Sequence, residues 1–407
     1  AYVHLSNNIE VKEPLKQFTD PAKDFVHSIV PDDQFISSIL DNIGAHTLTF
    51  PLLERNLTTI DANVTWPLFT GGKRIFATRI GNRMVDLAEV GREEAGAILQ
   101  SELVETYYAL RLAQRVVDVR EQTFLGLQKH YRNAMKLEEN GMINKAERLF
   151  AQVTMDEAKR ELESARTDLN VAQNALKVLL NVEDTTSIHP SSPLFMNHDL
   201  PDELYFKNLV GTGNYVVSKL RIQEVMADNQ LKISKSAYIP TIALFGKQTL
   251  YADNLPKNLM PRTLIGVGFT WNIFDGLNRE ANIRQARLTK QTLQLGREKA
   301  QNDLEVLVDK LYSEIQKAKD DVATLNTTIE MSRELVRIRK KSFQEGMATS
   351  TDVIDAETML SKVQIAFLLA YYKYDVALAS LLSTCGMPES FWQYSRTGQT
   401  ENFIFEK

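Results

Sequence analysis

Cysteine, tryptophan and proline are scarce in this sequence of 407 residues, which contains one cysteine, three tryptophans and twelve prolines. A lone cysteine cannot form a disulfide within the chain, so we expect Cys385 to be a small buried apolar residue. An excess of positive charge is also lacking, since 47 basic residues are set against 52 acidic ones and the net charge is −5. This balance argues against a protein that binds nucleic acid.

Recognisable catalytic and cofactor motifs are missing. The sequence has no Walker loop, dinucleotide fingerprint or nucleophile elbow, and its six histidines lack the spacing of metal ligands. We therefore expect no catalytic residues, no cofactor and no metal site, and the chain is not predicted to be an enzyme.

Long uninterrupted apolar runs are missing as well. A helix needs about 20 predominantly apolar residues to cross a bilayer. The closest stretch, residues 365–385, is interrupted by Lys373 and Asp375, so a transmembrane helix is not expected.

What the sequence does contain is a motif that occurs twice, Trp-x-x-Phe-x-Gly-x-x-Arg. Its residues are Trp66, Phe69, Gly71 and Arg74 in the first copy and Trp271, Phe274, Gly276 and Arg279 in the second. The copies lie 205 residues apart, and the same offset relates Gly141-Met142 to Gly346-Met347. In each copy an alternating strand ends at a glycine and a helical pattern follows, so the motif predicts a strand–helix junction. The constant offset indicates an internal duplication.

Each repeat continues as a long helix. No proline occurs between Gly71 and Gly141 or between Gly276 and Gly346, and both stretches are rich in strong helix formers. About 70 helical residues would span roughly 105 Å, which is typical of a coiled coil or a helical barrel. Apolar residues from 304 to 336 recur in steps of four and three, and nearly the same stripe occurs 205 residues earlier. We interpret this stripe as a packing seam.

A second helical pattern follows each of the later glycines, over residues 146–180 and 351–384. A glycine, a short link and a fresh helix predict a helical hairpin. The two tips are formed by Gly141, Met142, Gly346 and Met347.

Four stretches alternate between apolar and polar residues, as strands do. They are residues 1–12, 57–68, 238–251 and the stretch that ends in the second tryptophan motif. A long loop with a helical patch at 34–40 separates the first two. The faces opposite the apolar ones carry Asp61, Asn63, Gly266, Gly268 and Thr270. The second repeat opens with a helix over 203–236, so by symmetry a helix is expected before residue 1.

The alternation fits a soluble sheet or an outer-membrane barrel, and the polar faces favour a wet barrel lumen. Tryptophans near the strand ends fit a membrane interface, although each indole is equally compatible with packing in a strand–helix corner. Four strands cannot close a barrel and open edges are not tolerated in lipid, so several chains would share the strands. Three copies would supply twelve strands.

The duplicated motif, the proline-free helices and the sequence Gly-Met-Ala-Thr-Ser-Thr-Asp-Val-Ile-Asp-Ala at 346–356 resemble the TolC-like outer-membrane efflux proteins. The resemblance covers essentially the whole chain. It implies a mainly α protein with a small membrane β part: a homotrimer whose shared β-barrel lies in the outer-membrane lipid and continues as a long α-helical barrel across the periplasm of a Gram-negative bacterium. It further implies a passive exit duct of a tripartite efflux or type I secretion system, with a periplasmic adaptor (membrane fusion) protein and an inner-membrane transporter as partners. The alternative is a soluble periplasmic coiled-coil scaffold or adaptor.

The resemblance also divides the chain and suggests functional residues. The expected parts are a first strand pair with a long loop (1–68), a first long helix and return helix (69–182), an equatorial connection with a helix (183–237), a second strand pair (238–274), a second long helix and return helix (275–386) and a polar tail (387–407). The hairpin tips are expected to contact the adaptor. Asp352, Asp355 and Glu147 match acidic positions that narrow the periplasmic aperture in the family, whereas Ala348 stands where an arginine is found. Helix capping is the competing interpretation of Asp352, which follows Thr349-Ser350-Thr351.

Overall fold

The computed structural model describes residues 2–4, 11–12, 19, 38–39, 49–50, 56–183, 188–253 and 262–401. The chain forms two compact units. One combines residues 1–76 with 232–283, and the other combines residues 77–231 with 284–407.

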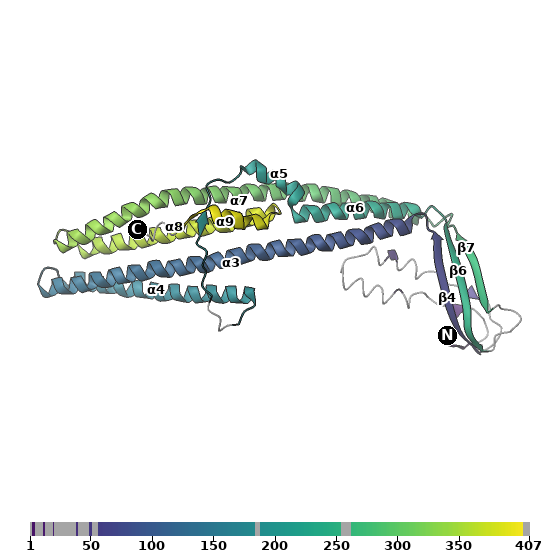
Figure 1. The fold of residues 1–407 in the computed structure, drawn as a ribbon, viewed down its shortest axis with the longest axis horizontal. Helices are drawn as coiled ribbons and strands as arrows, with labels where there is room; N and C mark the ends of the chain where they lie inside the picture. The colour runs from purple at the N-terminus through teal and green to yellow at the C-terminus, as the bar shows by residue number, and fades with distance from the viewer. Residues whose placement is uncertain are drawn as a thin grey trace. The chain divides into compact units, whose positions relative to one another are not determined.

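The first unit is built on an antiparallel sheet with the strand order β1-β4-β6-β7 (Figure 1). Its strands are β1 (Tyr2–His4), β4 (Asn56–Phe69), β6 (Thr241–Asp253) and β7 (Thr263–Thr270). A separate pair joins β2 (Val11–Lys12) to β3 (Thr49–Phe50). The prediction of a single strand over 1–12 is wrong, because its two described parts, β1 and β2, pair with different strands. In the predicted 34–40 patch Ser38 and Ile39 are helical, and the rest lies outside the described residues.

The register of the sheet separates an apolar face from a polar one. Trp66 lies opposite Leu244, and Leu244 lies opposite Val267, so the three side chains share a face. This exposed apolar belt comprises Ile60, Val64, Trp66, Leu244, Ile265, Val267 and Phe269. On the other face the Asp61 carboxylate accepts a hydrogen bond from Thr249 at 2.6 Å and lies 3.0 Å from the Lys247 ammonium. The alternation predicted for β4 is confirmed, and the belt is not covered by the described part of this chain.

The second unit contains most of two helical hairpins (Figure 1). The first hairpin joins α3 (Lys73–Glu139) to α4 (Lys145–Leu180), and the second joins α7 (Asn278–Gln344) to α8 (Ser350–Thr384). The long helices α3 and α7 each have 67 residues, a span of about 100 Å at 1.5 Å per residue. The predicted long helices and their duplication are thus confirmed.

The helix expected over 203–236 is interrupted. It consists of α5 (Glu203–Gly213) and α6 (Tyr215–Ser236), which meet at Asn214. The Asn214 side-chain oxygen accepts hydrogen bonds from the backbone of Val216 at 2.8 Å and of Val217 at 3.2 Å. Its amide nitrogen donates to the Thr384 carbonyl at 2.8 Å. The residue therefore starts a new helix and ties this start to the end of α8.

An aromatic core holds the second unit together around α8. Phe195 of β5 (Phe195–Met196) contacts Tyr374 of α8, Tyr108 of α3 and Phe391 edge-on, with ring centroids 5.4–6.1 Å apart. Phe391 begins α9 (Phe391–Thr397), which follows the short helix η1 (Pro388–Ser390), and β8 (Gln399–Thr400) pairs with β5. The expectation that the segment from residue 387 is only a polar tail is therefore corrected, because Phe391 in this segment is buried in the core.

Helix α8 is the one described helix that is long and apolar enough to cross a membrane by length and composition. However, 61% of its most apolar window is buried within the protein, as in a core helix. Cys385, directly after α8, is buried as expected.

Candidate functional site

The two hairpin tips have the same backbone geometry. Gly141 and Gly346 have φ angles of 71° and 72°, the left-handed conformation that glycine adopts without strain. At each tip the following methionine donates its backbone N–H to the carbonyl five residues earlier, at 2.8 Å, which ends the helix as a Schellman motif. Met142 and Met347 are then 63% and 72% exposed. Each tip therefore presents a flexible apolar side chain to its surroundings.

The return helices begin with side-chain caps at equivalent positions. Asn144 caps α4, and its side-chain oxygen accepts from the Glu147 backbone at 3.0 Å. Thr349 caps α8 in a capping box with Asp352. There the Asp352 carboxylate accepts from the Thr349 backbone at 2.9 Å and from the Thr349 hydroxyl at 2.7 Å. The capping interpretation of Asp352 is thus confirmed.

Asp352 also has a cationic partner across the hairpin. The Arg339 guanidinium of α7 lies 3.3 Å from the second carboxylate oxygen. The hydrogen bonds from Thr349, and then the charge of Arg339, lower the pKa of Asp352. Asp355 lies one turn further along α8 and is exposed. That the acidic residues Asp352, Asp355 and Glu147 narrow an aperture remains a prediction.

A buried polar contact that the sequence did not reveal joins α3 to the second hairpin. The His130 ring lies against Phe343 of α7 at a centroid distance of 4.7 Å, and its Nε2 is 2.7 Å from the Ser350 hydroxyl at the start of α8. Burial, and then the nearby Lys340 ammonium, lower the pKa of His130 to about 4. Lys340 forms an ion pair with the largely buried Glu357 of α8. The first hairpin is therefore linked to the second by a neutral histidine, which lies near an ion pair within the second hairpin.

Gly126 of α3 makes room for that ion pair. A Cβ atom at this position would lie 2.9 Å from a carboxylate oxygen of Glu357. Real Cβ atoms do not approach a neighbour so closely, so this glycine permits the helices to pack around the carboxylate.

The second strand–helix junction explains the arginine of the repeated motif. Arg279 donates to the carbonyls of Asn272 at 3.0 Å and Ile273 at 2.8 Å, and its guanidinium lies 4.7 Å from the centroid of the Tyr238 ring. Trp271 donates its indole N–H to the Tyr238 carbonyl at 3.2 Å while it remains 52% exposed. The indole therefore both packs in the corner and faces outward.

The first junction relies on glycine in the same place. Gly71 has φ +62°, and a Cβ there would lie 2.9 Å from Cβ of Ile239. Gly276 has φ +68° in the second copy. Phe69 and Phe274 are 46% and 75% exposed, so neither phenylalanine is a core residue of the described chain.

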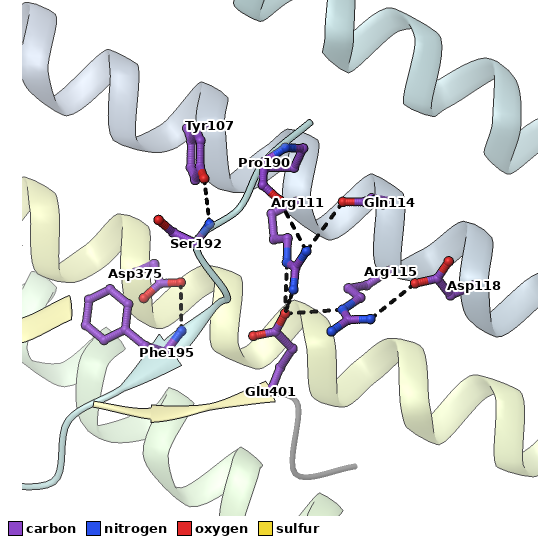
Figure 2. Close-up of polar contacts among 10 residues, drawn as sticks. All are labelled: Tyr107, Arg111, Gln114, Arg115, Asp118, Pro190, Ser192, Phe195, Asp375 and Glu401. Carbon is purple, nitrogen blue, oxygen red and sulfur yellow. Dashed lines mark hydrogen bonds and ion pairs between the residues drawn. The ribbon is translucent and has the colours of Figure 1, made fainter. Parts of the chain in front are cut away.

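Figure 2 shows a second polar cluster that sequence reasoning missed, beside the aromatic core. The Glu401 carboxylate, which is fully buried, accepts hydrogen bonds from Arg111 at 2.9 Å and Arg115 at 3.2 Å. Asp375 is also fully buried and accepts from the Phe195 backbone at 3.4 Å. Burial raises the pKa of Asp375 well above its usual range, and the Glu401 charge adds to this. Within the described ranges no three His, Cys, Asp or Glu side chains form a group that could hold a metal ion.

Comparisons with known proteins agree with this arrangement. The profile of the family described as "Outer membrane efflux protein" matches residues 54–182 and 216–387. The chain is 23% identical over 294 residues to the outer membrane efflux protein BepC of Brucella suis, covering 70% of this chain and 62% of that protein. It is 21% identical over 293 residues to the alkaline protease secretion protein AprF of Pseudomonas aeruginosa, covering 70% of this chain and 60% of that protein. The chain thus spans less than two thirds of the length of these relatives.

Solved structures show the same fold. The outer membrane protein VceC of Vibrio cholerae superposes with a TM-score of 0.72 at 14% identity, over 95% of this chain and 87% of that one. The open state of the MtrE outer membrane channel of Neisseria gonorrhoeae gives a TM-score of 0.68 at 16% identity, over 95% and 94% of the two chains.

Proposed function

Because this chain belongs to the outer membrane efflux protein family, we propose that it is one protomer of a trimeric duct through which molecules leave a Gram-negative cell. The duct would cross the outer membrane as a shared β-barrel and continue through the periplasm as a tube of helices. It would serve a tripartite efflux or type I secretion system and have no catalytic chemistry of its own.

One observation carries this proposal: the sheet of the first unit has an exposed apolar belt on one face and a polar network on the other. Lipid requires an apolar outer surface, whereas a water-filled lumen requires a polar inner one. The alternation of Val64 in the belt with Asp61 and Thr65 on the opposite face meets both requirements. A soluble scaffold would instead have to cover the belt with protein.

The open edges of the sheet support the proposed assembly of three chains. Unpaired strand edges are too costly in hydrocarbon, so the strands of one chain must continue into those of a neighbour. Three chains with four strands each would close a twelve-stranded barrel. The parts at 1–68 and 238–274 would contribute this barrel, those at 69–182 and 275–386 the helical tube, and those at 183–237 and 387–407 its equatorial girdle.

The hairpin tips and the starts of the return helices α4 and α8 would form the periplasmic end of the duct. Asp352, Asp355 and Glu147 would line the periplasmic mouth, since all three lie within the first two turns of the return helices. Gly141, Met142, Gly346 and Met347 would meet a periplasmic adaptor, which would link the duct to an inner-membrane transporter. Exposed methionines suit such a contact because their side chains adapt to a partner.

Two adjacent substitutions in β4 test the membrane assignment. Val64→Arg places a charge in the belt and should reduce insertion into lipid vesicles, at a cost of about 2–4 kcal/mol near the bilayer midplane. Thr65→Arg places the same charge on the polar face, so the protein should still insert and its conductance in planar bilayers should change. Equal insertion of both variants, or a wild-type protein that conducts no ions, would contradict the proposal.

A further inference from the structure

The two carboxylates near the second tip have different electrostatic surroundings. Both oxygens of Asp352 are engaged, one by the Thr349 cap and the other by the Arg339 guanidinium at 3.3 Å. Asp355 is exposed, and in the described part of the chain no basic side chain lies within ion-pair distance of it. Asp352 and Arg339 together carry no net charge, whereas no basic partner among the described residues balances Asp355.

The neighbouring basic residues of α7 do not compensate Asp355, because they have other partners. Arg337 pairs with Glu334 one turn earlier in the same helix at 2.6 Å. Lys340 pairs with Glu357 of α8. Arg337 lies two residues before Arg339, so at 3.6 residues per turn it points to nearly the opposite side of α7.

The first repeat lacks this compensation. Residue 134, the position equivalent to Arg339, is a buried alanine. Within the described residues, no ion pair joins Glu147, which is equivalent to Asp352, to the facing helix; the neighbouring Arg148 pairs with Glu138 of that helix instead. The arginine is a property of the second hairpin alone.

We propose that Arg339 is a selectivity-determining residue that cancels the charge of Asp352 at the periplasmic mouth, so that Asp355 and Glu147 set the preference for cations. This inference rests on the proposed function, because it concerns the mouth of the duct. A unit charge about 7 Å from a permeating ion in water contributes an interaction close to RT, which changes the local ion concentration roughly threefold. A change of this size is measurable as a shift in the cation-to-anion permeability ratio.

The test is the reversal potential of the trimer in planar bilayers under a salt gradient, with four variants. Asp355→Asn should lower the cation-to-anion ratio by at least about sevenfold, because losing the charge lowers the cation concentration and raises the anion concentration by roughly threefold each, and Arg339→Gln should raise the ratio by a similar factor. The double variant Arg339→Gln/Asp352→Asn should match the wild type, because it removes one charge of each sign and the asparagine oxygen still accepts from the Thr349 cap. Arg337→Gln is the matched control on the other side of α7 and should leave the ratio unchanged.

The outcomes separate the two proposals. A wild-type protein without conductance would refute the duct itself, and this inference with it. In conducting channels, a double variant that loses as much cation preference as Asp355→Asn would show that Asp352 is not compensated. An Arg339→Gln variant that behaves like the wild type, or an Arg337→Gln variant that behaves like Arg339→Gln, would also overturn the role of Arg339.

Discussion

The buried histidine between the hairpins makes the stability of the protein depend on pH. His130 is 5% exposed, and its pKa is lowered from 6.5 to about 4 by burial and by Lys340 of α7. Lys340 is itself paired with Glu357 of α8. The folded state therefore holds the imidazole neutral over a range of pH in which the unfolded chain already binds a proton.

The sign and size of the effect follow from this difference in pKa. Above pH 6.5 the imidazole is neutral in both the folded and the unfolded state, so its lowered pKa does not reduce the free energy of unfolding. As the pH falls from 6.5 to about 4, the unfolded state takes up the proton first, so the free energy of unfolding decreases by roughly 3 kcal/mol in total. The loss levels off once the folded state is protonated as well.

His130→Gln isolates this contribution, because glutamine does not titrate and still offers hydrogen-bonding atoms to Ser350. Urea unfolding of both proteins in detergent, followed by circular dichroism between pH 4 and 7.5, gives the difference in their free energies of unfolding. Other titrating groups are common to both proteins and cancel in this difference. We expect the wild type to lose about 3 kcal/mol relative to the variant on acidification. Parallel pH curves for the two proteins would refute the reasoning.

Two further predictions concern the strand–helix junction and the C-terminal cluster. Gly71→Ala should lower stability by at least about 1 kcal/mol, because the position needs a positive φ and has no room for a methyl group. The control Gly81→Ala, in an open helical position, should raise stability by up to about 1 kcal/mol. Melting temperatures of both variants would show the difference. Glu401→Gln should cost about 3 kcal/mol, because it leaves two largely buried arginines without their shared carboxylate, whereas Glu157→Gln on the exposed surface of α4 should have no measurable effect. A junction that tolerates alanine, or equal effects of the two glutamine variants, would contradict these accounts.

The sequence was informative wherever structure depends on nearby residues. The long helices could be predicted because proline is absent from them and helix formers are abundant. The tips could be predicted because glycine and a fresh helix start recur with the same offset. The faces of β4 followed from the alternation of residue types, which the register then confirmed.

Contacts between distant parts of the chain could not be predicted in this way. His130 and Ser350 are 220 residues apart, and no local pattern distinguishes this histidine from the five others. Arg111 and Glu401 are 290 residues apart, and Glu401 lies in a segment whose composition predicted only a polar tail. The break at Asn214 depends in part on the Thr384 carbonyl, 170 residues away. In each case a polar side chain gains its role only through the packing of helices that the sequence does not place.

The mass of the native assembly in detergent tests the central claim most directly. An open sheet with an exposed apolar belt requires neighbouring chains, so native mass spectrometry should find three chains of 46.2 kDa, about 139 kDa in all, after removal of detergent. A stable monomer that remains soluble without detergent would contradict the claim, because such a chain would have to cover its own belt and strand edges.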